Sequence, residues 1–583
     1  MVGKVAELKN QFAQNSDNTG KNVGHLWSQW NWKRQPKIKE WNESRNYVFA
    51  TSTQSTSNAE LPWKNSTTVP KLCQIRDNLH ANYLSTLFPN ANWFKWEGES
   101  EEDEAKALMI EGFMRDLTER AEIRGVVSQL LLDYIDTGNV FASVEYVRDV
   151  ITLADGRTLP GYEGPRITRI SPMDICFNPT APRFEDAPKI VRKVMSIGEI
   201  ARLSTMPGQE KWADALTKMK SMRGAGSYSV DDWHKALGFE VDGFGDLREY
   251  YGQEYVEVLE FFGDYYDNDT GTLHENQHIV VVDRSILVYS GEIESWAGKR
   301  NIVHAPWRRR PDNLYGMGPL DNLVGMQYRL DHLENLKADA MDLMIHPPLV
   351  IYGQVEPFDY GPNCEISIPE MDGRVEELGK NFAGVASANS EMQMIEARME
   401  EFAGAPKQAM GQRTPGEKTA FEVQTLEAAS GRIFQEKITN FEVHVLEPLL
   451  NLMLAETRQR ITGTSLTRIH DTELDMDMFM EIEPTDLNGN GALRPRGARH
   501  FAENAIIIQN VNNLMNGKLG EILAPHMSTE NLAKAMERLM ALEEFALFRK
   551  NQGLVEGAEQ QDLANNLQQT VEEKQLAPAP GGV

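Results

Sequence analysis

Apolar residues recur at helical spacing along much of the chain, and the longest such stretch lies near its middle. No proline interrupts the sequence between Pro319 and Pro347, which predicts one helix from Pro319 to Ile345. At 1.5 Å per residue this helix would be about 40 Å long. Its apolar stripe comprises Leu323, Met326, Leu330, Leu333, Ala340 and Met344, with Lys337 as the one polar member. The stripe predicts sideways packing against another helix.

The other face of this predicted helix is acidic and contains Asp321, Asp331, Glu334, Asp339 and Asp342. Charges at this density exclude a membrane span, and no window of about 18 apolar residues occurs elsewhere in the chain. Taken alone, the helix is typical of the core of a large globular protein. The elements around it suggest a different role.

The remaining patterns predict an α+β protein that is mainly helical. Helices are expected over 70–88, 101–117, 119–137, 196–222 and 391–402, and over 418–460 with a bend at Pro448; strands are expected over 140–147, 150–159, 167–175, 255–265, 278–288, 349–352 and 466–482. The central helix is thus followed by a small β-rich excursion, a second helix, a polar loop over 408–416 and a long third helix.

Three segments have no clear place in this order. Residues 1–59 are polar but include Trp27, Trp30, Trp32 and Trp41, which either pack locally or complete their burial on a neighbouring molecule. Residues 224–245 are rich in glycine and are expected to form a surface insertion. The tail after Gly553 is rich in Gln, Asn and Glu and is not expected to order by itself.

Composition narrows the possible functions. The 583 residues include 86 acidic and 59 basic side chains, for a net charge of −27. This charge argues against a protein that grips nucleic acid over a broad basic face, although nucleic acid could still pass without sticking. The three cysteines, Cys73, Cys176 and Cys364, form no paired motif, and the N-terminus lacks an apolar signal region. A protein of a reducing cytoplasm is therefore expected.

Two short motifs suggest enzymes, and neither has the required context. His274, Glu275 and His278 match the H-E-x-x-H zinc motif, but they are expected at a turn between strands, where residues four apart cannot share one zinc. The stretch GQRTPGEKT resembles a phosphate-binding loop, but Glu417 displaces Lys418 from its register and the loop follows a helix. A zinc or nucleotide hydrolase is the weaker alternative, and we expect neither an enzyme nor a cofactor.

Three longer stretches in order support a structural assignment. They are DYIDTGNVFASVEY, then NIVHAPWRRRPDNLYGMGPLDNLVGMQYRLDHLENL, then QRTPGEKTAFEVQTLEAASGRIFQEKITNFEVHVLEPLL. Their order and spacing resemble those of portal proteins, the head-to-tail connectors of tailed bacteriophages, and most closely those of short-tailed phages. The resemblance runs from about Glu101 to about Gly517.

The resemblance implies a portal-type fold in which wing, stem, clip and crown assemble as a ring. The implied segments are an N-terminal arm (1–59), wing (60–311), first stem helix (312–346), clip (347–390), second stem helix (391–406), tunnel loop (407–417), long bent wing helix (418–460), wing return (461–525), helical crown (526–560) and disordered tail (561–583).

The resemblance also implies roles for particular residues. The stem would line a DNA tunnel with Asp331, Glu334, Lys337, Asp339 and Asp342. The tunnel loop would present Gln408, Met410, Gln412, Arg413, Thr414 and Lys418, of which Arg413 and Lys418 either touch DNA phosphates transiently or are ordinary solvated charges. The clip would meet the adaptor and terminase through Glu356, Asp359, Tyr360, Glu370, Asp372 and Arg374. Arg308, Arg309 and Arg310 would contact a neighbouring subunit, with DNA binding or simple solvation as the alternatives.

The implied function is that of a dodecameric ring at one capsid vertex, made in the host cytoplasm and located in the virion, through which double-stranded DNA enters and leaves. Its partners would be further copies of itself, terminase, adaptor and tail proteins, the major capsid protein and scaffolding or internal core proteins, with no membrane. Another virion component, either a tail adaptor or an internal ejected protein, is the nearest alternative.

Overall fold

The computed structural model describes residues 16–49, 65–89, 93–152, 158–205, 210–223, 255–267, 271–293, 302–345, 347–353, 356, 367–368, 373–377, 383–403, 432–461, 463–471, 476–496, 511 and 532. These residues mix helix and sheet, in agreement with the expected α+β class. The chain divides into two compact units, one of Met1–Trp93 and Leu117–Ile461 and the other of Phe94–Asp116 and Thr462–Val583. We describe each by itself.

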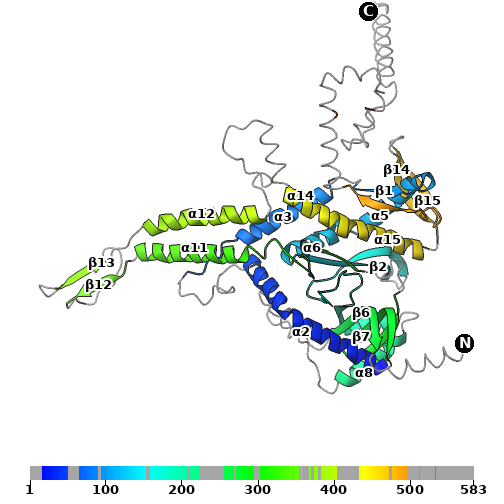
Figure 1. Cartoon of the computed structure of the whole chain (residues 1–583), viewed down its shortest axis with the longest axis horizontal. Coiled ribbons are helices and arrows are strands. Elements are labelled where there is room, and N and C mark those ends of the chain that lie inside the picture. The colour runs from blue at the N-terminus through cyan, green and yellow to red at the C-terminus, as the bar shows by residue number, and fades with distance from the viewer. Residues whose placement is uncertain are drawn as a thin grey trace, which may run out of the picture. The chain divides into compact units, whose positions relative to one another are not determined.

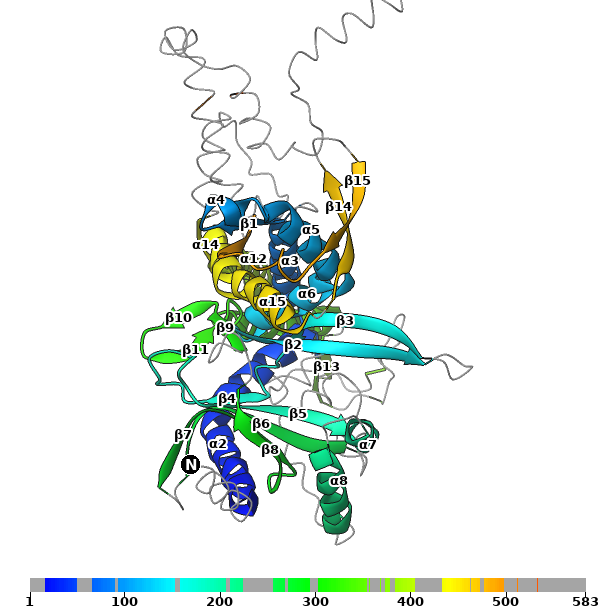
Figure 2. The same cartoon turned by 90° about the vertical axis from the view of Figure 1, so that its right-hand side faces the viewer.

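A five-stranded antiparallel sheet in the first unit is covered by helices on both faces (Figure 2). Its strands, in spatial order, are β4 (Ile175–Phe177), β5 (Lys189–Ser196), β6 (Tyr255–Asp267), β7 (Thr272–Val282) and β8 (Ile286–Glu292). Helix α2 (Ser16–Phe49) covers one face, and α7 (Ile197–Ser204) and α8 (Glu210–Arg223) cover the other.

The alternation of apolar residues along the strands explains this layering. On β7, Ile279 and Val281 pack with α2, whereas Val280 and Val282 pack with α7 and α8. Successive side chains of a strand point to opposite faces, so a continuous apolar run requires cover on both sides. The predicted strand over 278–288 is divided in the structure by a turn at Asp283 and Arg284, both of which have positive φ.

Two of the arm's four tryptophans lie on α2 and are buried within the chain. Trp27 and Trp41 are 1% and 2% exposed and pack inside the same chain, so local packing is the correct alternative for both. Trp32 is exposed. The helix approaches the β7–β8 turn so closely that a Cβ on Gly24 would lie 2.2 Å from the Arg284 carbonyl oxygen. Glycine is therefore required at this crossing.

A second sheet is built around the predicted hairpin. It contains β2 (Asn139–Thr152), β3 (Thr158–Arg169) and β9 (Ile302–Pro306) in the order β3-β2-β9. Strands β2 and β3 form a long ribbon (Figure 2) in which Val144 pairs with Ile167. The chain therefore reverses direction where the sequence predicted, although the turn itself lies outside the described residues.

The helices predicted over 70–88 and 101–137 are present, with shifted ends. Helix α3 (Lys71–Leu87) buries the five apolar residues of its predicted stripe, namely Leu72, Ile75, Leu79, Tyr83 and Leu87. The predicted pair over 101–137 forms three pieces, α4 (Glu101–Glu104), α5 (Ala107–Arg120) and α6 (Ile123–Asp136). The last break coincides with Glu122, whose φ is +50°.

The long third helix changes to a π-helical turn immediately before the proline where a bend is predicted. Its described part consists of α14 (Arg432–Phe441), a π-helical turn η4 (Glu442–Leu446) and α15 (Glu447–Arg460). Pro448 lacks an N–H, and its ring clashes with the carbonyl four residues earlier in a regular α-helix. The wider turn immediately before Pro448 accommodates this clash.

The second unit contains two separate two-stranded sheets, one of which joins segments that are far apart in the chain. Strand β1 (Phe94–Gly98) pairs antiparallel with β16 (Gly491–Pro495), while β14 (Ser465–Asp471) and β15 (Met476–Ile482) pair antiparallel in the region 466–482 where strands are predicted. Trp96 on β1 is fully buried, with its indole N–H donating to the Asp103 carbonyl of α4 at 3.0 Å and its backbone N–H to the Glu111 carboxylate of α5 at 2.8 Å.

Candidate functional site

Two long helices extend together from the body of the first unit. They are α11 (Val324–Ile345) and α12 (Ala383–Ala403), with β12 (Leu349–Tyr352) and β13 (Arg374–Glu377) paired antiparallel at their far end (Figure 1). We call α11, α12 and these two strands the helical hairpin. It matches the predicted sequence of helix, β excursion and helix.

The helix ends differ from the prediction at two places. The first helix begins at Val324 and not at Pro319, because residues 319–323 form turns in which the Leu323 N–H donates to the Leu320 carbonyl. The second helix begins at Ala383, eight residues before the predicted Glu391. The β excursion is correspondingly shorter than the predicted 347–390.

The base of the hairpin is a regular apolar core. Leu330 and Leu333 on α11 are buried, as are Met392 and Met399 on α12. Leu330 and Leu333 belong to the predicted stripe, and α11 contacts α12, so the predicted sideways packing against another helix is confirmed at the base.

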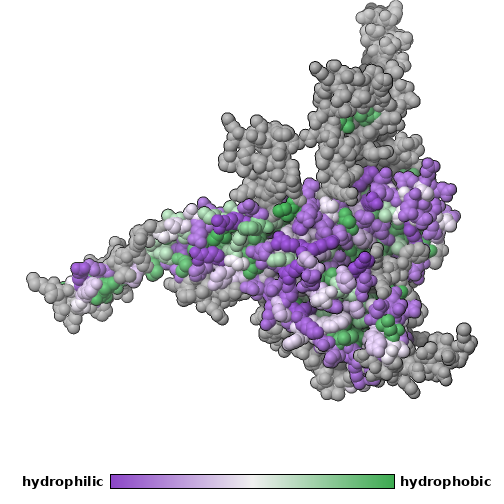
Figure 3. Space-filling view, in the orientation of Figure 1, coloured by the Kyte–Doolittle hydropathy of each residue, from purple (hydrophilic) through white to green (hydrophobic). Residues whose placement is uncertain are grey.

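The outer part of the hairpin exposes its apolar residues. Ile345 is 70% exposed and Met344, which belongs to the predicted stripe, is 38% exposed. The exposed apolar set on this part is Leu336, Met341, Leu343, Met344, Ile345, Ile351, Tyr352 and Met394. In the space-filling view apolar residues recur along the hairpin towards its tip (Figure 3). We call this set the outer apolar surface.

A polar face of α11 is covered by residues 65–70, which we call the strap. The Asp339 carboxylate accepts from the Asn65 N–H at 3.0 Å, Asn335 Oδ1 from the Thr67 N–H at 2.8 Å, and Asp331 Oδ1 from the Val69 N–H at 2.9 Å. The acceptors are spaced by four residues on one face of α11. The strap thereby obtains its backbone hydrogen bonds from side chains of a helix.

The spacing explains why this ladder is regular. Eight residues of α11, from Asp331 to Asp339, rise about 12 Å. Four residues of the strap cover the same length at about 3 Å each, which is the rise of an extended chain. Asn335 contacts Thr67 through two hydrogen bonds, because its Nδ2 also donates to the Thr67 carbonyl at 2.9 Å.

The expectation that Asp331 lines a tunnel is therefore wrong. Its side chain is fully buried under the strap, and its Oδ2 atom has no hydrogen-bond partner among the described residues. Burial raises the pKa of Asp331 to about 6, against the opposing effect of hydrogen bonds from Val69 and Gln327.

The other predicted stem residues are more accessible. Glu334 and Lys337 form an ion pair along the helix. Asp339 and Asp342 both accept hydrogen bonds from the Asn65 side chain, at 2.8 and 3.0 Å, so they lie on the strap side of α11.

A buried ion pair joins the start of α3 to the end of α12. Lys71 Nζ lies 2.6 Å from Glu400 Oε1, and the two side chains are only 9% and 8% exposed. Leu72 and Val69 are in turn bonded to the Gln327 side chain. These contacts fix the base of the hairpin to the body of the unit, and sequence analysis did not anticipate them. The polar spacing of Gln327, Asp331, Asn335 and Asp339 was the available signal.

Only part of the predicted tip and loop can be placed. Glu356 is exposed, and Arg374 is exposed, pairs with Glu376 and lies 5.7 Å from the Tyr352 ring centroid. The other predicted tip residues, Asp359, Tyr360, Glu370 and Asp372, lie outside the described residues, as do the predicted loop residues Gln408, Met410, Gln412, Arg413, Thr414 and Lys418.

The basic run stands on an edge hairpin. Strand β10 (Arg308–Arg310) pairs with β11 (Asn313–Met317), and Arg309 and Arg310 are exposed. Arg308 lies 5.2 Å from the Trp307 ring centroid. The exposed pair is available to a second molecule.

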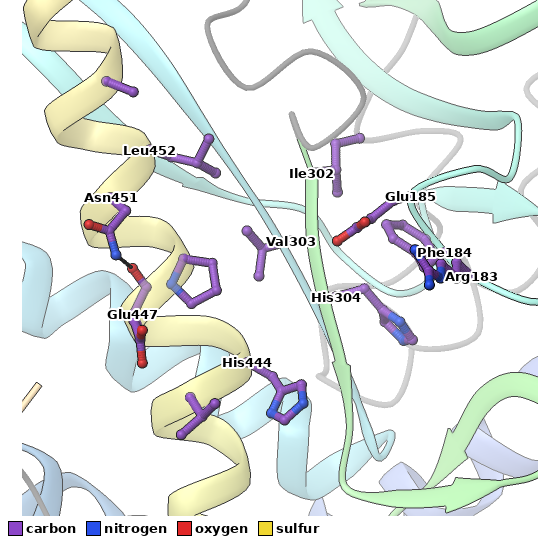
Figure 4. A pocket seen from close by; sticks show the side chains of 13 residues that line it. Arg183, Phe184, Glu185, Ile302, Val303, His304, His444, Glu447, Asn451 and Leu452 are labelled. Carbon is purple, nitrogen blue, oxygen red and sulfur yellow. Dashed lines mark hydrogen bonds between the residues drawn. The ribbon is translucent and has the colours of Figure 1, made fainter. Parts of the chain in front are cut away.

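A cavity of about 920 Å³ lies between α15, η4, β9 and residues 183–185 (Figure 4). His304 and His444 line it. Burial and the nearby Arg309 lower the pKa of both imidazoles, to about 3 for His304. Both rings are therefore neutral at pH 7. Sequence analysis gave no signal for this cavity.

The zinc-like motif lies on strand β7. His274 and His278 are consequently on extended chain, and the His278 ring stacks on Phe262 with centroids 4.6 Å apart. The helical face that the motif needs is not formed there. Nowhere in the described part of the chain do three or more His, Cys, Asp or Glu side chains come together as a possible metal site. Within the described ranges, no helix has both the length and the apolar character needed to cross a bilayer.

No family model matches the chain, and a search of curated proteins finds no match.

Proposed function

We propose that the chain is a portal-type subunit, twelve copies of which form a ring at one capsid vertex for genome packaging and ejection. The outer apolar surface of the helical hairpin is the observation that supports this most. A single chain leaves Met341, Leu343 and Ile345 exposed by 46%, 44% and 70%. Exposed apolar residues gathered on one element are typical of a protein–protein interface.

In a closed ring every subunit has a neighbour on both sides, so the outer apolar surface of each copy is covered. In cyclic assemblies one face of each subunit meets a different face of the next, and the contacts repeat until the ring closes. Parallel hairpins placed side by side would bury the outer apolar surface between neighbours. Arg309 and Arg310, which are exposed on β10, would add contacts to acidic residues of the adjacent subunit.

The order of elements supports the same proposal. The hairpin with its β tip follows two antiparallel sheets and precedes a long helix that is interrupted by a π-helical turn just before Pro448. Portal proteins, which the sequence resembles, would place such a hairpin as the stem and its tip as the clip. The clip would receive terminase and later the adaptor and tail, with Glu356 and Arg374 exposed for these contacts.

Charge supports passage of DNA without retention. Each subunit has a net charge of −27, and a ring multiplies this charge. Binding of DNA to a protein depends largely on neutralising its phosphates with Lys and Arg, so an acidic wall disfavours it. The wall would include Glu334 and other accessible acids, but not Asp331. Location at a capsid vertex of the virion follows from this role.

The experiment removes the outer apolar surface and measures assembly. Leu336→Ser combined with Met341→Ser changes side chains that are each 46% exposed in the single chain, so the fold should be unaffected. We expect wild-type protein to sediment as a ring and the double variant as smaller species with an unchanged circular-dichroism spectrum.

Leu273→Ser is the matched control, because it removes an apolar side chain of similar exposure, 57%, from the sheet and not from the hairpin. It should sediment as a ring. Rings of unchanged size and stability from the Leu336, Met341 double variant would contradict the proposed interface.

A further inference from the structure

Trp32 on α2 is more exposed than any other large apolar side chain in the described ranges, at 76%. Trp27 and Trp41 of the same helix are buried. A single exposed apolar side chain is ordinary on a protein surface, so this exposure alone identifies no partner. Tryptophan is, however, among the residues that most often anchor a protein–protein contact by filling a pocket of the partner. The surroundings of Trp32 indicate what kind of partner would bury it.

The helix surface around Trp32 is basic in an acidic protein. Residues 18–39 contain no Asp or Glu, although the whole chain has a net charge of −27. Lys21, Lys33 and Lys39 are exposed. Lys21 and Lys39 lie about three turns before and two turns after Trp32, and therefore on the same face of α2. A surface that buries Trp32 would meet these ammonium groups, so complementarity requires it to carry carboxylates.

The cavity between α15 and β9 has a suitable size and an apolar wall. Its volume of about 920 Å³ is many times the roughly 30 Å³ that one water takes in the liquid, so it admits an indole group. The apolar lining residues include Phe184, Ile302, Val303, Pro448 and Leu452 (Figure 4). An aromatic side chain seated there would remove apolar surface of both molecules from water.

Carboxylates lie on two walls of this cavity. Glu185 comes from the segment before β5 and Glu447 from the start of α15 (Figure 4). A carboxylate has about four acceptor sites, so each can receive an ammonium group in addition to its contacts within the chain. Arg183 is the one Lys or Arg of the lining, and its side chain is exposed. The lining therefore suits an indole that has lysines beside it.

His444 supplies an acceptor for an indole N–H. Its Nδ1 lies 3.2 Å from the Asn440 carbonyl oxygen, which can only accept, so Nδ1 carries the proton and Nε2 remains an acceptor. Burial and the nearby Arg309 lower the pKa of His444, so the ring is neutral at pH 7. The residue is exposed, and an indole N–H can only donate. The two groups are therefore matched in their hydrogen bonding.

We infer that Trp32 of one copy inserts into the cavity between α15 and β9 of the next copy, with its indole N–H donating to His444 and Lys33 and Lys39 facing Glu185 and Glu447. The inference rests on the proposed ring and names one contact within it. The inserted side chain and the cavity are different parts of the chain, so the contact is heterologous and repeats from copy to copy until the ring closes.

The test places the photo-crosslinking residue p-benzoylphenylalanine at position 32 of the full-length protein. Irradiation of rings should join two chains, and peptide mass spectrometry should find the link within residues 302–304 or 443–455. The same residue at position 273 is the matched control, because Leu273 is also an exposed apolar side chain of the first unit. It should give no link to those two segments.

Two variants examine the contact from its two sides. Trp32→Ala removes the inserted side chain, and Ala455→Trp fills the cavity from its wall, where Ala455 is half-buried. Each should raise the protein concentration at which half of the chains are assembled by about 10-fold or more, with an unchanged circular-dichroism spectrum. The double variant should be no worse than either single variant, because both changes remove the same contact.

Several results would overturn the inference. Rings of normal mass in which position 32 links to another segment, or to none, would refute this contact and leave the proposed ring intact. A stable monomer from the wild type would contradict both. Additive losses in the double variant would show that Trp32 and the cavity act at separate places. Should p-benzoylphenylalanine at position 32 prevent folding, the comparison of single and double variants decides the matter alone.

Discussion

At the scale of residues, Asp331 shows what the sequence could not supply. Its position among four other acids on a predicted helix indicated a solvated face. In the structure its carboxylate accepts the Val69 N–H, from a segment 262 residues earlier in the chain. Helical periodicity places a residue on a face, but it does not say which distant segment covers that face.

Burial of Asp331 has a consequence for stability. Its pKa is raised to about 6 from an ordinary 3.8, so between these values the folded protein holds a proton that the unfolded chain has released. The contribution to stability is fully present below about pH 4 and is lost as pH rises through 6. Asp133 behaves in the same direction, with a pKa of about 6.

Asp331→Asn should flatten this dependence, because the group that titrates is removed while the acceptor for Val69 remains. We expect the variant to be at least as stable as wild type at pH 7 and to lose less stability between pH 4 and 7. Calorimetric Tm values between pH 4 and 7 measure this pH dependence of stability. The variant should keep the part of the dependence that comes from Asp133. Parallel curves for the two proteins would show that Asp331 does not titrate there.

The Lys71–Glu400 pair gives a second prediction at this scale. Lys71→Met leaves a buried carboxylate without its partner and should lower the free energy of unfolding by about 3 kcal/mol. The double variant with Glu400→Met should recover most of this loss. Arg329→Met serves as control, because its pair with Glu391 is about half exposed and should change stability by less than about 1 kcal/mol.

At the scale of elements, the helices and strands whose apolar residues recur with a regular period along their whole length were predicted well. All five apolar residues of the α3 stripe are buried, and the β2–β3 hairpin forms where alternation and turn residues indicated. Helix ends were predicted less well. Pro319 suits a first helical position, but the chain turns through 319–323 before α11 begins, as Leu320 and Leu323 are both fully buried there.

The strap is the element that sequence analysis missed. Residues 65–70 have no periodic signal, because the backbone N–H groups of Asn65, Thr67 and Val69 bond to side chains of α11 and not to a regular neighbouring strand. Nor did the sequence reveal the cavity between α15 and β9, since its lining comes from segments that are far apart in the chain.

Asn335→Ala tests the strap. The substitution removes both bonds to Thr67 and leaves its backbone groups without these partners, so we expect a loss of about 1 to 3 kcal/mol. Hydrogen exchange should become faster at 65–72 and stay unchanged on the sheet. Glu334→Gln, which alters only a partly exposed pair on the same helix, should cost less than about 0.5 kcal/mol. Unchanged exchange at the strap would contradict the ladder.

At the scale of the whole molecule, the proposal depends on what covers the outer apolar surface. A core helix would have buried this surface within the chain, and α11 does so only over its first half. Asp331 is buried and cannot form part of a tunnel wall. The exposed apolar residues from Leu336 outward therefore support a ring more strongly than the acidic face does.

The mass of the assembled particle tests this proposal most directly. Native mass spectrometry of the full-length protein should give one closed species near twelve times the subunit mass of 65.9 kDa. Its mass should stay constant as protein concentration rises, because a ring has no free end. A stable monomer, or a series of masses that lengthens with concentration, would contradict the portal assignment.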